Sequence, residues 1–173
     1  QAKGLTEEQI EAVLKAEAFR RLPIDQRINY VMDTVDTMQR VFREALENIA
    51  EEIKNFDVDE ATEMASDVIA RARAMGYSVG IGRGLCLKGF CYRLKGEYDA
   101  GLEVLKEALT IAKRIPDRNI EATALYYLGN IYRDLGDLSN VFTHYEKALA
   151  INEESGDEYY QSVILSSISN LLY

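Results

Sequence analysis

Side chains that most often carry catalysis or hold a metal are few in this chain and stand at unsuitable spacings. Its 173 residues include one histidine, His144, and two cysteines, Cys86 and Cys91. On a helix these cysteines would be separated by roughly 7.5 Å along the axis with diverging side chains, so no mutual disulfide is expected. His144 has no Cys, Asp or Glu at metal-ligand spacing, and no Ser, His and Asp constellation can be identified. We therefore predict no metal site, no cofactor and no enzymatic activity.

Three closely spaced glycines suggest a phosphate-binding loop, but their neighbours do not complete either common pattern. Gly80, Gly82 and Gly84 are followed by Leu85, where the dinucleotide motif needs its last glycine. Lys88 is not preceded by glycine, as the P-loop requires. We interpret the three glycines as a flexible turn that enters the helix holding Leu85.

The charge balance restricts the class of partner. There are 20 basic and 29 acidic residues, a formal net charge of −9, so nucleic-acid binding is not expected. Acidic clusters such as Glu51-Glu52 and Glu153-Glu154 are interpreted as solvated helix faces. No apolar run approaches the roughly 18–20 residues of a membrane span, and no signal peptide is found. We predict a cytoplasmic protein without a membrane or nucleic-acid partner.

An internal repeat organises the second half of the chain. Laying the segment 79–118 on the segment 119–158 matches nine pairs of identical residues. The pairs are Leu85 and Leu125, Gly89 and Gly129, Tyr92 and Tyr132, Arg93 and Arg133, Gly96 and Gly136, Ala108 and Ala148, Leu109 and Leu149, Ile111 and Ile151, and Asp117 and Asp157. Apolar residues recur every three or four positions on both sides of Gly136, which predicts two helices in each unit.

The positions of Gly129, Tyr132, Gly136 and Ala148 resemble the consensus of the tetratricopeptide repeat. The period of about 40 residues is longer than the usual period of about 34 residues, and it resembles the longer-helix subclass seen in peptide-sensing bacterial regulators. This resemblance implies an all-α fold, a right-handed α-solenoid of helix-turn-helix units. It is strong over 79–173 and weaker before that.

We divide the chain into N-terminal helices, 1–56, and repeats, 57–173. The repeats comprise a half repeat 57–78, full repeats 79–118 and 119–158, and a truncated repeat 159–173. The first residue is Gln, and the last helix is apolar without a covering partner. We therefore expect either that the chain is a piece of a longer protein or that a partner subunit covers its last helix.

Two helices are expected before the repeats. Residues 6–9 form a capping box that opens a helix to about Arg21, and Pro23 suits the first turn of the next. That next helix runs from Ile24 to Asn55 and doubles as the first helix of a degenerate repeat. Its apolar residues form two heptad series: Ile28, Val35, Phe42 and Ile49, and Val31, Met38 and Ala45. This seam either packs against the first helix and the first repeat or forms a dimer interface or signal-transmitting helix.

The resemblance also implies a ligand site, an extended peptide held in a concave groove lined by the first helix of each unit. The residues expected to bind it are Arg83, Phe90, Arg93, Tyr126, Asn130, Arg133 and Asn170. Asn130 and Asn170 stand one repeat apart, and their amides could clamp a peptide backbone. Arg93 and Arg133 favour an acidic or carboxylate-bearing ligand. The alternative is that these are ordinary solvated repeat residues.

The two cysteines are expected to differ in their exposure to solvent. Cys86 could be exposed in the groove, whereas Cys91 aligns with Ile131 and is expected in the core.

These features predict a protein–protein interaction or peptide-sensing module that acts as a scaffold. The alternative is the regulatory N-terminal region of a signalling enzyme, such as a diguanylate cyclase or histidine kinase, which acts through oligomerisation and whose output domain is absent. A homodimer could form through the long N-terminal helix or through the exposed C-terminal helix.

Overall fold

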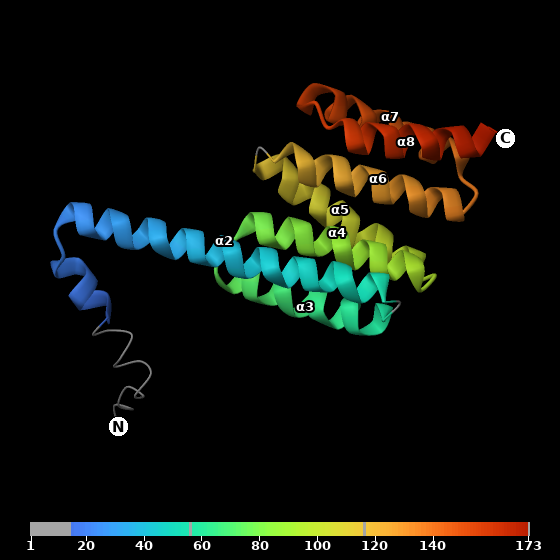
Figure 1. Cartoon of the computed structure of the whole chain (residues 1–173). Coiled ribbons are helices and arrows are strands. Elements are labelled where there is room, and N and C mark those ends of the chain that lie inside the picture. Colours follow the sequence, from blue (N-terminus) through green and yellow to red (C-terminus); the bar gives the residue numbers. More distant parts are fainter. Residues whose placement is uncertain (1–14, 56, 116, 173) are drawn as a thin grey trace. The chain divides into compact units, whose positions relative to one another are not determined.

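The computed structural model describes residues 15–55, 57–115 and 117–172. The predicted capping box at 6–9, Pro116 and Tyr173 lie outside these residues. Over the described ranges the structure is helical and contains no strand, which confirms the predicted all-α fold. A helical stretch at 15–21 is followed by the helices α2 (Ile24–Lys54), α3 (Val58–Ala74), α4 (Ser78–Leu94), α5 (Tyr98–Arg114), α6 (Arg118–Asp134), α7 (Leu138–Ser155) and α8 (Glu158–Leu172), shown in Figure 1.

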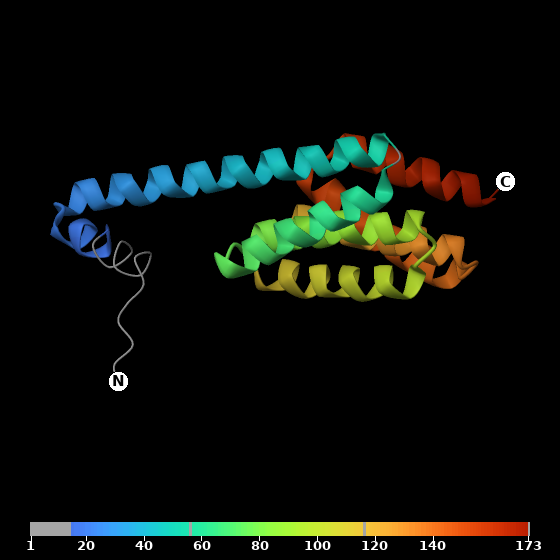
Figure 2. The same ribbon diagram turned by 90° about the horizontal axis from the view of Figure 1, so that it is seen from below.

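The chain separates into two compact units, one up to residue 43 and one from 44 to 173. The boundary lies within α2, which is one continuous helix of 31 residues (Figures 1 and 2). The division that we predicted between 56 and 57 stays a prediction.

The second unit has the period that the sequence match predicted. The helices α4, α6 and α8 begin at positions 78, 118 and 158, and α3, α5 and α7 begin at positions 58, 98 and 138, so both series advance by one constant interval. From α3 onward each helix packs against the next one in the chain, and α4 also contacts α6 directly. Packing of each helix mainly with its neighbours is the arrangement of a helical solenoid. The predicted all-α solenoid is therefore confirmed.

The turn between α6 and α7 shows how the sequence ends one helix and begins another. Gly136 has a φ of 78°, the left-handed conformation that favours glycine, and the Asp137 N–H donates to the carbonyl of Tyr132 at 2.9 Å. Asp137 then caps α7, because its carboxylate accepts from the backbone N–H of Asn140 at 3.1 Å. Hydrogen bonds from the side chain and backbone of Asn140 hold the pKa of Asp137 below its ordinary value.

Two glycines inside helices allow neighbouring helices to approach closely. A Cβ on Gly89 would lie 2.5 Å from Leu105, and a Cβ on Gly129 would lie 2.5 Å from the ring of Tyr145. The nearest atoms belong to these large side chains, which fill the space that glycine leaves.

The run of Gly80, Gly82 and Gly84 lies inside α4, so our interpretation of it as a flexible turn is wrong. All three glycines are buried. A Cβ on Gly82 would lie 2.9 Å from the Ile120 side chain, and one on Gly84 would lie 2.8 Å from that of Ile69. Close packing of α6 and α3 against α4 therefore favours glycine at positions 82 and 84, despite a helix-propensity cost of about 1 kcal/mol each.

The predicted heptad seam of α2 changes its exposure along the helix. Ile28 is 56% exposed, whereas Phe42 is 5% exposed and Ile49 is fully buried. Despite its length, neither α2 nor any other helix among the described residues combines the length and the apolar character that a membrane span requires.

Candidate functional site

The predicted site residues come from the first helix of each repeat. Arg83, Phe90 and Arg93 lie on α4, Tyr126, Asn130 and Arg133 on α6, and Asn170 on α8. Their burial differs widely: Asn130 is 3% exposed, Arg83 and Asn170 are exposed, and the others are half-buried. Because α4 and α6 contact each other, their side chains can meet across one repeat.

A charged cluster joins the ends of α4 and α6. Arg93 donates through two guanidinium nitrogens to the two carboxylate oxygens of Asp134, at 2.6 and 3.3 Å. The Nε of Arg133 lies 3.7 Å from the same carboxylate. The side chains of Arg93 and Asp134 are only 18% and 22% exposed, so solvent screens this ion pair less than a pair on an open surface. Because two cations share one carboxylate, the cluster of Arg93, Arg133 and Asp134 carries one net positive charge.

Asn130 is held by a residue of the following helix. The hydroxyl of Tyr145 donates to Oδ1 of Asn130 at 2.5 Å, and the Tyr145 side chain is fully buried. Burial raises the pKa of Tyr145, while the nearby Arg133 opposes that rise. The amide oxygen that we expected to contact a peptide is therefore occupied within the fold. A peptide-clamping role for Asn130 stays a prediction.

Four aromatic rings form a continuous row beside this cluster, here named the aromatic row: Phe90, Tyr127, Tyr126 and Tyr145. The ring centroids of Phe90 and Tyr127 lie 5.0 Å apart, nearly parallel, and those of Tyr126 and Tyr145 lie 5.7 Å apart. Tyr126 and Tyr127 complete the row at 5.7 Å. Burial raises the pKa of Tyr127, so its phenol stays neutral. Aromatic rings supply large apolar contact areas and are enriched where proteins bind one another.

The structure thus brings Arg93, Tyr126, Asn130 and Arg133 together, and Phe90 joins them through the aromatic row. Arg83 and Asn170 are exposed, and within the described part of the chain no hydrogen bond or ion pair connects them to this group.

Sequence reasoning missed the roles of Tyr127, Tyr145 and Asp134. Two signals in the sequence were available. Tyr127 and Asp134 are each next in sequence to a predicted site residue, and the chain has 11 tyrosines and no tryptophan, so tyrosine supplies most of its aromatic rings. The bond from Arg93 to Asp134 spans 41 positions and could not be read from spacing alone.

The groups considered for chemistry are engaged within the fold. Cys86 is 3% exposed and does not lie open in a groove, and burial raises the pKa of its thiol to about 12. Cys91 is fully buried, as expected. Nδ1 of His144 lies 2.7 Å from the carbonyl oxygen of Asn140. Among the described residues, no group of three or more His, Cys, Asp or Glu side chains is placed to hold a metal ion.

Comparison with known proteins identifies the same part of the chain. Residues 81–154 match the model of the tetratricopeptide repeat family. A 78-residue stretch, 45% of this chain, is 31% identical to the 43 kDa receptor-associated protein of the synapse from Tetronarce californica. That stretch covers 19% of the relative's own length. The matched range extends from α4 to α7, so the helix pairs that hold the charged cluster and the aromatic row are those that are similar to tetratricopeptide repeats.

Proposed function

We propose that the chain is a protein–protein interaction module and that it binds an extended, acidic or carboxylate-bearing peptide of its partner on the face formed by α4, α6 and α8. The similarity of residues 81–154 to tetratricopeptide repeats supports a protein partner, as does the match to a protein that its name describes as receptor-associated. The site lies on a rigid, repeated scaffold, which favours recognition of a chain that extends over several units.

One observation carries the proposal for the ligand. Arg93 and Arg133, from successive repeats, share the single carboxylate of Asp134 beside the aromatic row. Arg133 is the more loosely paired cation, so its guanidinium is free to meet a second carboxylate. The half-buried rings of Phe90 and Tyr126 offer apolar contact to neighbouring side chains of the same ligand. An anionic group flanked by apolar residues fits this combination.

We also propose that the module has no catalytic activity of its own. Its single histidine contacts the backbone of its own helix and packs against Tyr132, and both thiols are buried. Neither thiol is therefore exposed as a nucleophile, and Nδ1 of the histidine is engaged within its own helix.

The test is selection of binding peptides from a random displayed library, followed by calorimetry with the selected peptides. Arg133→Ala is expected to weaken binding at least tenfold, because a charge-assisted hydrogen bond contributes roughly 1.5–3 kcal/mol. Arg114→Ala removes the same charge from an exposed position at the end of α5 and serves as the matched control, with unchanged affinity. If Arg133→Ala binds the selected peptides as tightly as the unchanged chain, the ligand site is elsewhere.

A second candidate, regulation of a signalling output through oligomerisation, is favoured by the exposed apolar face of α2. Its test is the open reading frame that follows Tyr173: an output domain there supports this candidate, and a stop codon contradicts it.

A further inference from the structure

The first half of α2 carries apolar side chains that nothing in the described part of its own unit, from residue 15 to 43, buries. Ile24, Ile28, Val31, Met32 and Val41 are between 48% and 69% exposed. Scattered exposed apolar residues are common, but several of them along one side of a helix indicate an interaction surface. We name these five residues the open stripe of α2.

The open stripe has the spacing of a helix–helix interface. It follows the heptad series through Ile28 and Val31, with Ile24 one heptad before Val31 and with Met32 and Val41 on the flanks. The same series is buried further along the helix, at Phe42 and Ile49. The stripe therefore continues a seam that is already packed at its other end.

Most charged side chains in the first half of α2 lie away from the open stripe; the exceptions are Asp25 and Arg27, at flanking heptad positions near its start. Asp33, Asp36, Arg40 and Arg43 are exposed and fall at the outer heptad positions. Two copies of this helix could therefore meet along the core positions of their stripes, a and d, without opposing like charges. An anionic membrane surface is a poorer match, because the polar face carries acidic as well as basic residues and membrane-surface helices are rich in Lys and Arg there.

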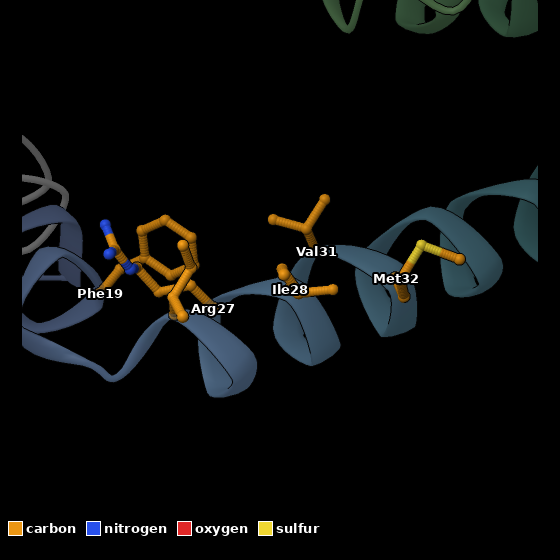
Figure 3. A pocket seen from close by; sticks show the side chains of 6 residues that line it. Phe19, Arg27, Ile28, Val31 and Met32 are labelled. Atoms are coloured by element: carbon orange, nitrogen blue, oxygen red, sulfur yellow. The ribbon is translucent and has the colours of Figure 1, made fainter.

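A hollow at the start of the stripe offers a place for a partner's side chains. It has a volume of about 340 Å³ and is lined by Phe19 together with Ile24, Arg27, Ile28, Val31 and Met32. Figure 3 shows Phe19 and Arg27 close together at the beginning of the helix, with Ile28, Val31 and Met32 following along it. Apolar walls around a shallow hollow suit an aliphatic side chain of a neighbouring helix, as a knob enters a hole.

Area and heptad pattern both favour a second copy of α2 as the occupant. Each half-exposed side chain of the stripe leaves on the order of 100 Å² uncovered, so two copies bury about 1,000 Å², the lower bound for a specific interface. Another α2 is a helix of matching length and pattern.

We propose that the chain self-associates through the open stripe, with α2 of one copy packed along α2 of a second copy. This interface lies on a different helix from the proposed peptide site. The two proposals can therefore fail independently.

The test is analytical ultracentrifugation of the full chain over a concentration series. Ile28→Glu combined with Val31→Glu places two charges in the seam and is expected to weaken association at least about 100-fold, because buried unpaired charge is strongly disfavoured. Asn29→Glu combined with Thr37→Glu adds the same charge to the opposite, exposed face of the same helix and is the matched control, expected to stay within about twofold.

Circular dichroism checks that the variants keep their helicity. If the glutamate pair lowers it, Ile28→Ala with Val31→Ala is measured instead, with a smaller weakening expected in the same direction. A full chain that stays monomeric above about 100 µM contradicts the proposal, since an interface with a dissociation constant of about 1 µM would be nearly saturated there. Association that neither stripe variant weakens, or that the control weakens equally, also contradicts it.

Discussion

At Gly129, one hydrogen atom in place of a methyl group determines how closely α6 and α7 pack. A Cβ at this position would lie 2.5 Å from two ring atoms of Tyr145. Gly129→Ala is therefore expected to destabilise the protein by about 1–2 kcal/mol, since overpacking outweighs the gain of roughly 1 kcal/mol in helix propensity. Urea denaturation followed by circular dichroism measures the change.

A double-mutant cycle identifies the cause of that loss. With Tyr145→Ala in the background, the obstructing ring is absent, and Gly129→Ala should become neutral or stabilising. If Gly129→Ala costs the same free energy in both backgrounds, contact with Tyr145 is not the reason for the glycine.

Cys86 predicts a pH dependence of stability. Burial first, and the nearby Asp117 second, raise the pKa of its thiol from 9.0 to about 12. The folded thiol keeps its proton to higher pH than the unfolded one, so its contribution is complete below pH 9 and is lost as the pH rises towards 12. Cys86→Ala should thus lose less stability between about pH 8 and about pH 10.5 than the unchanged chain.

The comparison for Cys86→Ala is Leu85→Ala, which removes a buried side chain from the same helix without removing a thiol. Its stability should fall with pH as steeply as that of the unchanged chain. Equal pH slopes for Cys86→Ala and Leu85→Ala would show that the thiol does not titrate as expected.

At the scale of single elements, the sequence predicts those features that depend on local pattern. Apolar spacing and the glycine after Leu135 predicted two helices in each unit, and the match of 79–118 with 119–158 predicted their period. The glycines at the start of α4 were misread, because the side chains that require them, Ile69 and Ile120, lie on other helices. The pairing of Arg93 with Asp134 was missed for the same reason, since it depends on how α6 packs against α4.

The cap of α6 is expected to matter for the helix that carries half of the proposed site. The carboxylate of Asp117 accepts from the backbone N–H groups of Asn119 and Ile120, at 3.1 and 3.2 Å. Asp117→Ala leaves those donors unpaired and should destabilise the protein by about 1 kcal/mol. Thermal unfolding measures this, and Glu103→Ala, an exposed acid in the middle of α5, should change little. Equal shifts for the two variants would mean that the lost charge, not the cap, is responsible.

At the scale of the whole molecule, the packing is mainly between consecutive helices, so stability should divide along the chain. The unit from 44 to 173 has its own buried clusters, one around Leu105 and Leu128 and another around Tyr145 and Ile164. Repeat arrays of this kind are stabilised chiefly by contacts between neighbours. Residues 44–173 alone are therefore expected to fold, with a midpoint of thermal unfolding within about 5 °C of the full chain.

This deletion also separates folding from self-association, because it removes the open stripe of α2 but keeps the buried Ile49. The shortened chain should be helical and monomeric at concentrations where the full chain associates. A shortened chain that is folded but still associates would place the self-association surface on the repeats, with α8 the first helix to examine. A shortened chain that fails to fold would instead show that the first half of α2 contributes to the stability of the repeats themselves.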